Sequence, residues 1–213
     1  GAIGKIEDAP ALVVETVPGL TDVTAIAASE QSACALRGGG ELWCWGYNGY
    51  GQLGNGSYDA LTAPTKTPFH LDWKSVSLGA DQGCGIRADE TAWCWGEGAP
   101  GDGLGTAETY AGPVSSVAAG MAFSCGLHAD DSSVKCLGAN QLGQTGGGSQ
   151  AALVGTPAGV VGLGAVMQLD ASPLRACAVQ VDGSLYCWGA GNEGEIGNGA
   201  AVRMLPVKVQ GLP

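Results

Sequence analysis

Charged side chains are scarce in this sequence. Lys, Arg, Asp and Glu make up 14% of the 213 residues, against about 25% in an average globular domain. Basic residues are the scarcest, with nine Lys and Arg against twenty Asp and Glu, and the formal net charge is −11 at pH 7. Phosphate backbones and anionic membranes are bound by clusters of basic side chains, whereas these nine stand singly along the chain. We therefore expect no nucleic-acid partner.

A hydrophobic run of the kind that crosses a membrane is also lacking. The long uncharged stretch at residues 136–169 is interrupted near its end by Pro157 and several glycines, unlike the Leu- and Ile-rich norm of a membrane helix. We therefore expect no membrane span. The first four residues have neither the basic nor the apolar segment of a signal peptide, so any targeting segment is expected to have been removed or to lie upstream.

Catalytic side chains are few. The two histidines, His70 and His128, fall in different repeats and outside any Ser/His/Asp or Cys/His setting. We expect His128 to be a solvated residue at the head of a turn. The Gly-x-Gly patterns at residues 54–56 and 197–199 lack the following helix and the Lys of a phosphate-binding loop. The sequence therefore predicts no cofactor, and a protein that is not an enzyme.

Glycine, by contrast, is abundant, with 38 residues, and it belongs to a repeat. A body containing two cysteines recurs with spacings of 50, 41 and 52 residues, and a Gly-rich tail and a proline follow each body. The chain also opens with a lone tail at residues 1–4, so there are four bodies and five tails. We predict one domain, 1–213, made of a partial repeat at 1–20 and repeats at about 21–70, 71–115, 116–164 and 165–213.

Each body is predicted to be a β-hairpin, because turn residues such as Asp182 and Gly183 separate two apolar runs. If the two cysteines of a body face each other, small residues face bulky rings on the opposite face of the hairpin. A larger side chain at Gly85 should then collide with Trp93. The predicted pairs are Ala33 with Trp45, Ala35 with Trp43, Gly83 with Trp95, Gly85 with Trp93, Ala176 with Trp188 and Ala178 with Tyr186.

Both faces of each hairpin are apolar or small, so a neighbouring blade must cover each face. Residues 23–27 and 73–78 suggest a first, innermost strand. The outermost strand should follow the proline of each repeat, as after Pro206, because a sheet tolerates proline at its edge. The predicted fold class is an all-β β-propeller with blades of about four antiparallel strands, comprising four complete repeats and an N-terminal partial one.

The eight cysteines form four pairs separated by 10, 10, 11 and 10 positions, each bracketing one hairpin. Direct cross-strand neighbours have Cβ atoms about 4.5–5.5 Å apart, close to the roughly 3.5–4.5 Å of a disulfide. Zinc ligands are usually spaced more closely, so no metal site is expected; reduced core cysteines are the other alternative. Disulfides imply export to an oxidising compartment, and hence a secreted, extracellular or cell-surface protein. The predicted bonds are Cys34–Cys44, Cys84–Cys94, Cys125–Cys136 and Cys177–Cys187.

The segment from Cys44 to Gly56, with the pattern Cys-Trp-Gly-x-Asn-x-x-Gly-Gln-Leu-Gly-Asn-Gly, is similar to the regulator of chromosome condensation (RCC1) repeat. The resemblance covers nearly the whole chain and implies a propeller, of the secreted bacterial type with one hairpin disulfide per repeat. It says little about activity, because the family includes a nucleotide exchange factor, a bacterial β-lactamase inhibitor and many secreted proteins. Chromatin and GTPase roles are not carried over, since there are four bodies rather than seven and a histidine common in the family is replaced by Ser32, Gln82, Phe123 and Arg175.

Three tyrosines in one connection, Tyr47, Tyr50 and Tyr58, are the candidate partner-binding residues, because Tyr is enriched in protein interfaces. Packing over the blade edge is the alternative for these rings. We predict a non-catalytic extracellular binding or structural module that presents loops to a protein partner, within a larger or self-associating assembly. An inhibitor of a secreted enzyme is the alternative, and an enzyme with an unrecognised site is less favoured.

Overall fold

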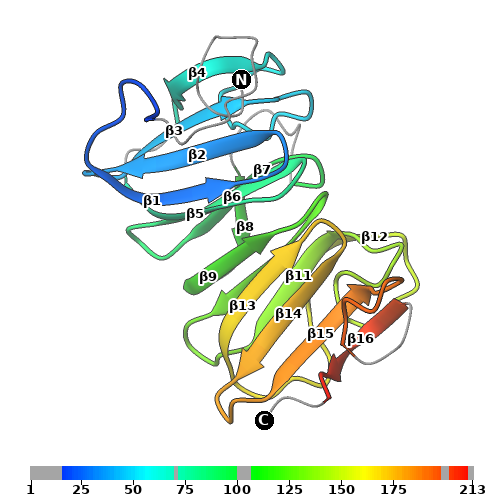
Figure 1. Cartoon of the computed structure of the whole chain (residues 1–213). Coiled ribbons are helices and arrows are strands. Elements are labelled where there is room, and N and C mark those ends of the chain that lie inside the picture. Colours follow the sequence, from blue (N-terminus) through cyan, green and yellow to red (C-terminus); the bar gives the residue numbers. More distant parts are fainter. Residues whose placement is uncertain (1–15, 70–71, 100–106, 198–201, 211–213) are drawn as a thin grey trace.

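The computed structural model describes residues 16–69, 72–99, 107–197 and 202–210, all of them in strands and connections without a helix. The strands form four four-stranded antiparallel sheets in which sequential strands are neighbours. These sheets are the blades of a propeller, and Figure 1 shows the first and the fourth at opposite ends of the molecule. Blade 1 contains β1 (Val23–Ala28), β2 (Ser32–Arg37), β3 (Glu41–Gly46) and β4 (Leu61–Lys66); blade 2 contains β5 (Trp73–Leu78), β6 (Gln82–Arg87), β7 (Ala92–Gly96) and β8 (Ala107–Tyr110); blade 3 contains β9 (Val114–Ala119), β10 (Phe123–His128), β11 (Val134–Ala139) and β12 (Leu153–Gly159); blade 4 contains β13 (Val166–Ser172), β14 (Arg175–Gln180), β15 (Leu185–Ala190) and β16 (Val202–Lys208).

The predicted hairpin register is confirmed in every body. Cys34 stands opposite Cys44, and the same pairing holds for the cysteines of the other three hairpins. The small residues therefore stand opposite the rings, as in the pairs Ala33 with Trp45 and Gly83 with Trp95. Each blade consequently has a disulfide face and, on its other side, a ring face, which carries the ring residues of the pattern or, in blade 3, Lys135 and Leu137.

Disulfide bonds join all four pairs, Cys34–Cys44, Cys84–Cys94, Cys125–Cys136 and Cys177–Cys187. One disulfide per repeat is thus built into the hairpin of each blade. Seven of the eight cysteines are buried, and Cys177 of blade 4 is half-buried. Four bonds in a chain without free cysteines are consistent with an oxidising compartment.

Three apolar clusters hold the blades together, one at each junction. The first packs Trp73 and Trp95 of blade 2 against the disulfide face of blade 1, including Leu36 and Leu42. The second places Val117 and other residues of blade 3 on the disulfide face of blade 2, and the third places blade 4 on the disulfide face of blade 3. Each ring face therefore covers the disulfide face before it, and the first strands of successive blades contact one another as innermost strands.

The predicted pairing of small residues with bulky rings needs one correction. A Cβ atom at Gly83 would overlap the ring of Trp95, as the register predicts. At Gly85, however, the nearest ring atoms belong to Trp73 of β5, at 2.7 Å from an added Cβ, and not to Trp93. Trp73 comes from the neighbouring strand at a register shift between β5 and β6. Gly85 stands opposite Trp93 as predicted, but the nearest ring over it is that of Trp73, which comes from β5 beside a bulge.

The prolines are also placed differently from the prediction. Pro64, Pro157 and Pro206 lie inside the outermost strands β4, β12 and β16 rather than before them, and Pro113 follows β8. In β4, β12 and β16 the register shifts next to the proline. A bulge removes the need for a ladder N–H at that position, so an edge strand accommodates proline in its interior.

The backbone conformation explains why glycine occupies the third position of the Cys-Trp-Gly pattern. Gly46 has a φ of 107°, and a Cβ there would collide with the carbonyl of Gln31. The next residue, Tyr47, donates its N–H to that same carbonyl at 2.8 Å. The corresponding glycines of the other blades, Gly96, Gly138 and Gly189, repeat this conformation. Glycine is therefore required where the third strand turns into the tail.

Candidate interaction loop on the first blade

The tail of blade 1 is a loop of residues 47–60 that is organised by one buried amide. Asn48 is fully buried, and its Nδ2 donates to the carbonyls of Ser57 at 2.8 Å and Asp59 at 3.0 Å and to Oδ1 of Asn55 at 3.0 Å. Its Oδ1 accepts the N–H of Leu53 at 2.9 Å. A buried amide that meets its hydrogen-bonding capacity fixes a loop in one conformation. We call residues 47–60 loop 1.

A second buried amide fixes loop 1 to the next blade. Oε1 of Gln52 accepts the N–H of Tyr50 at 3.0 Å, and its Nε2 donates to the carbonyl of Ala80 in blade 2 at 3.0 Å. The Nε1–H of Trp95, also in blade 2, donates to the carbonyl of Gln52 at 2.8 Å. Loop 1 is therefore held by hydrogen bonds on its inner side, which leaves its outer side for contacts with other molecules.

The structure places all three predicted tyrosines on loop 1. Tyr47 and Tyr50 contact each other edge to face, with ring centroids 6.2 Å apart. Their exposed fractions are 42% and 43%, and that of Tyr58 is 52%. The carbonyls on either side of Tyr58 are those that Asn48 binds. Loop 1 thus presents three exposed rings on a fixed backbone, although their role in binding stays a prediction.

Blade 3 contains the same loop without the tyrosines. In residues 139–152, which we call loop 3, Nδ2 of Asn140 donates to the carbonyls of Ser149 and Ala151, both at 3.0 Å. Gln144 accepts the N–H of Leu142 at 2.9 Å through Oε1, and its carbonyl accepts Nε1–H of Trp188 in blade 4 at 2.8 Å. The residues in the positions of Tyr47, Tyr50 and Tyr58 are Ala139, Leu142 and Gln150.

The role of Asn48 and Asn140 in organising the two loops was not predicted from the sequence. The signal was present, because the pattern Asn-x-x-Gly-Gln occurs at residues 48–52 and again at 140–144. The pattern indicates the repeat family and does not by itself indicate the hydrogen bonds. Its physical meaning, an amide that closes the loop and a glutamine that joins it to the next blade, becomes visible only with the hydrogen bonds.

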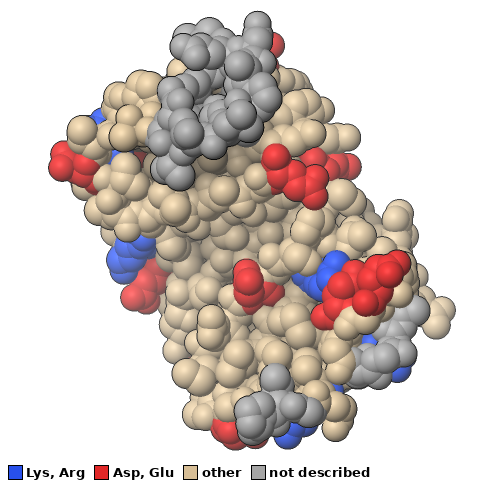
Figure 2. Space-filling view, in the orientation of Figure 1, with Lys and Arg blue, Asp and Glu red and all other residues tan. Residues whose placement is uncertain are grey.

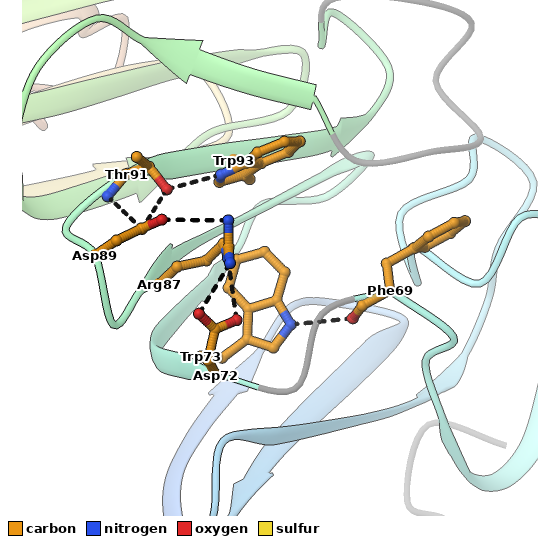
Figure 3. Close-up of polar contacts among 7 residues, drawn as sticks. All are labelled: Phe69, Asp72, Trp73, Arg87, Asp89, Thr91 and Trp93. Carbon is orange, nitrogen blue, oxygen red and sulfur yellow. Dashed lines mark hydrogen bonds and ion pairs between the residues drawn. The ribbon is translucent and has the colours of Figure 1, made fainter.

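A separate polar cluster lies at the turn end of blade 2 (Figure 3). Arg87 donates two hydrogen bonds to Asp72, both at 3.0 Å, and its Nη1 lies 3.3 Å from Asp89. Asp89 accepts hydrogen bonds from Thr91, which accepts Nε1–H of Trp93 at 2.9 Å. Hydrogen bonds from Thr91 and the nearby guanidinium lower the pKa of Asp89. The guanidinium of Arg87 is thus paired with two carboxylates at the turn.

One prediction about the histidines is wrong. His128 is 3% exposed, not solvated, and its ring lies edge-on to Tyr110 with centroids 6.3 Å apart. Burial, and then the charge of Lys135, lower its pKa. Ala129, Asp130 and Asp131 in the following turn are exposed, but the imidazole packs against Tyr110 of blade 2. His70 lies outside the described residues.

The visible surface is largely uncharged, with acidic groups in separate patches (Figure 2). Within the ranges that the structure describes, no three His, Cys, Asp or Glu side chains are grouped so that they could hold a metal ion. Those ranges also contain no helix long and apolar enough to cross a membrane. The opening tail at residues 1–4 and the partial repeat up to residue 15 lie outside them.

Comparison with known proteins finds the same repeat family by sequence and the same fold by structure. Models of the regulator of chromosome condensation (RCC1) repeat match residues 23–52, 39–86 and 182–213. Among solved structures, the chain is similar to human WBSCR16, with 21% identity and a TM-score of 0.78 over 90% of this chain and 53% of that chain. It is also similar to Prp20p of Saccharomyces cerevisiae, with 17% identity and a TM-score of 0.79 over 92% and 52%.

A third similar structure is yeast RCC1 (Prp20) bound to Kap60, with 18% identity and a TM-score of 0.80 over 92% of this chain and 50% of that chain. The chain therefore spans about half the length of these three structures. A search of curated protein sequences found no match. At these identities the structural likeness establishes the fold.

Proposed function

Because the chain is an RCC1-like repeat protein, we propose that it is a non-catalytic module that binds a protein partner through loop 1. The observation that carries the proposal is the group of three exposed tyrosines on a loop that Asn48 and Gln52 hold in place. Loop 3 has the same backbone hydrogen bonds without the tyrosines. The rings are therefore not needed to build the loop.

The fixed backbone favours binding. A partner loses less of its binding free energy to ordering when the loop is already held in one conformation. Tyrosine adds a large contact area with two rotatable side-chain bonds and a hydroxyl at its tip, which suits the centre of an interface. The solved relatives are consistent with a binding role, since the Prp20p structure is described with its binding to Gsp1p and histones and another holds Kap60.

The absence of catalysis is part of the proposal. His128 is buried in a setting that disfavours its charged form, so it is poorly placed to exchange protons with a substrate. The guanidinium of Arg87 is paired with Asp72 and Asp89. These two groups, which could have supplied a base and an anion-binding cation, are used within the fold.

The compartment is proposed to be extracellular or the cell surface. The support is one disulfide in each hairpin, with six of the cysteines buried at blade junctions. A chain reduced in the cytosol would lose all four cross-links. Inhibition of a secreted enzyme is the second candidate function, supported by the tyrosines of loop 1 on a chain of net charge −11.

Affinity capture from the native extracellular fluid tests the proposal. The bait is the 213-residue chain, compared with a Tyr47→Ala/Tyr50→Ala/Tyr58→Ala variant and with a Leu142→Ala variant in loop 3. We expect a partner that the wild type and Leu142→Ala capture equally and that the tyrosine variant captures at least about tenfold less. A secreted enzyme captured one to one and inhibited would favour the inhibitor. Equal capture by all three baits would contradict a role for loop 1.

A further inference from the structure

Loop 1 contains two asparagines that are each followed by glycine, Asn48-Gly49 and Asn55-Gly56. The backbone nitrogen of the following residue can attack an asparagine side-chain amide, and glycine allows this most readily because it has no side chain to obstruct the approach. The two asparagines have different surroundings, since Asn48 is fully buried, whereas Asn55 is half-buried and Gly56 is exposed. A third Asn-Gly pair, at residues 198–199, lies outside the described residues.

The hydrogen bonds of Asn48 protect its amide from this attack. Its Nδ2, which would have to leave as ammonia, donates hydrogen bonds to Asn55, Ser57 and Asp59. Its Oδ1 accepts the N–H of Leu53 at 2.9 Å. Loss of Nδ2 would leave two backbone carbonyls without their donor, which opposes the reaction. Burial also keeps water, which the reaction consumes, away from this amide.

The amide of Asn55 is held in the opposite way, through its oxygen. Its Oδ1 accepts the N–H of Ser57 at 3.1 Å, the Oγ–H of the same residue at 3.4 Å and Nδ2 of Asn48 at 3.0 Å. A side-chain oxygen bonded to the N–H two residues further on forms an Asx turn. This turn brings the carboxamide carbon toward the intervening backbone nitrogen, which belongs to Gly56.

These contacts favour attack at Asn55. When the nitrogen of Gly56 bonds to Cγ, negative charge develops on Oδ1, and the donors that already point at Oδ1 stabilise that charge. Among the residues that the structure describes, neither the N–H of Gly56 nor Nδ2 of Asn55 donates a hydrogen bond. The attacking nitrogen and the leaving nitrogen are therefore both unrestrained, whereas the oxygen between them is fixed.

We propose that Asn55 is a site of spontaneous deamidation, which alters loop 1 as the protein ages. The backbone nitrogen of Gly56 loses its proton to hydroxide and forms a bond to Cγ of Asn55. The Cγ–Nδ2 bond breaks, and Nδ2 leaves as ammonia after taking a proton from water. Water then opens the cyclic imide, either at Cγ, which gives aspartate, or at the backbone carbonyl, which gives isoaspartate. The reaction needs only water and hydroxide.

Each product changes the loop that presents the tyrosines. Both products add a negative charge to the segment between Tyr50 and Tyr58. Isoaspartate also adds a methylene to the backbone between residues 55 and 56, which displaces the carbonyl of Ser57 that helps to close the loop. Loop 3 has Gly147 at this position and cannot react in this way. The effect on binding rests on the proposed function of loop 1, whereas the chemistry at residue 55 does not.

Peptide mapping by mass spectrometry, after incubation of the whole chain at pH 8.5 and 37 °C, tests the chemistry. In the folded chain we expect Asn55 to deamidate at least about tenfold faster than Asn48. In the chain unfolded in guanidinium chloride, the two rates should agree within about twofold, because glycine follows both. Equal rates in the folded chain would overturn the proposal. An Asn55 amide that survives longer in the folded than in the unfolded chain would also overturn it.

A variant that lacks the amide tests the effect on binding. Asn55→Gly copies Gly147 of loop 3, so it should stay folded and acquire no new carboxylate at residue 55. Incubated wild type should capture at least about threefold less partner than fresh wild type, whereas incubated and fresh Asn55→Gly should capture equal amounts. Undiminished capture by wild type whose Asn55 has reacted would overturn the claim that deamidation alters loop 1. Absence of capture by fresh wild type would instead contradict the proposed function, while peptide mapping still decides the chemistry.

Discussion

Loop 1 and loop 3 share a backbone and differ in what they display. Asn48 and Asn140 close the two loops with the same set of carbonyl acceptors, and Gln52 and Gln144 join them to the following blade. At the positions of the three exposed tyrosines of loop 1, loop 3 has Ala139 and Leu142, which are half-buried, and the exposed Gln150. Hydrogen-bonded amides therefore belong to the architecture, and the tyrosines are an addition to it.

Removing the organising amide should give the largest loss of stability, and the same loss in both loops. Asn48→Ala leaves the buried N–H of Leu53 and the carbonyls of Ser57 and Asp59 without that partner, which should lower the free energy of unfolding by roughly 2–4 kcal/mol. Asn140→Ala should cost a similar amount. Urea unfolding measures both, with exposed Gln150→Ala as the neutral control. A loss confined to Asn48→Ala would show that the two loops are not equivalent.

Weakening the join between loop and next blade should cost less. Trp95→Phe and Trp188→Phe each remove an Nε1–H that donates to a loop carbonyl at 2.8 Å, together with part of a buried ring. We expect each to destabilise by about 1–3 kcal/mol. Trp43→Phe, whose ring is partly exposed and whose Nε1 donates to Glu41, is the matched control. If Trp43→Phe costs as much as the other two, the carbonyl contacts contribute nothing specific.

Low pH should destabilise the protein through blade 3, which has a buried histidine where blade 1 has Arg37. His128 of blade 3 occupies the position of Arg37 in blade 1, and burial lowers its folded-state pKa. A depressed pKa means that folding favours the neutral ring, so this stabilisation is complete above the ordinary pKa of about 6.5 and is lost as the pH falls through the folded-state value. The melting temperature should fall by a few degrees between pH 7.5 and 5.5. His128→Gln, which copies Gln180 of blade 4, should flatten that decline, and an unchanged slope would exclude the histidine as its source.

The smallest effect on stability is expected from the tyrosines. Tyr47→Ala and Tyr50→Ala remove rings that are more than two-fifths exposed and contact each other at the surface. The melting temperature should change by no more than about 2 °C. Scanning calorimetry checks this value. A drop comparable to that of Asn48→Ala would mean that the rings stabilise the loop by packing over the blade edge, which is the alternative to a role in binding.

Most of the blade could be predicted from the sequence, because the pattern of small and bulky residues determines the register. Ala33 with Trp45 and Gly83 with Trp95 follow directly from facing cysteines. The errors occur where the register shifts. The ring over Gly85 comes from Trp73 across a bulge, and Pro64 lies beside another bulge inside β4. A bulge depends on the geometry of two strands, which alternation within one strand does not show.

The burial of His128 and the role of Asn48 could not be predicted for a different reason. Both depend on three-dimensional contacts that a sequence pattern does not show. His128 lies beside Tyr110 of the preceding blade. Asn48 binds backbone carbonyls 9 and 11 residues further along the chain. The tyrosines of loop 1 were selected because Tyr is enriched in interfaces, and the structure finds them exposed. The identity of the protein that would bind these tyrosines does not follow from contacts within this chain.

Side-chain labelling by hydroxyl radicals, with and without the captured partner, tests the difference between the loops most directly. Leu142 of loop 3, which is half-buried and therefore partly accessible to the radical, serves as a control within the same molecule. If loop 1 is the binding surface, oxidation of Tyr47 and Tyr50 should fall severalfold in the complex, while oxidation of Leu142 stays the same. Unchanged oxidation of both tyrosines, or protection of Leu142 instead, would contradict the assignment of binding to loop 1.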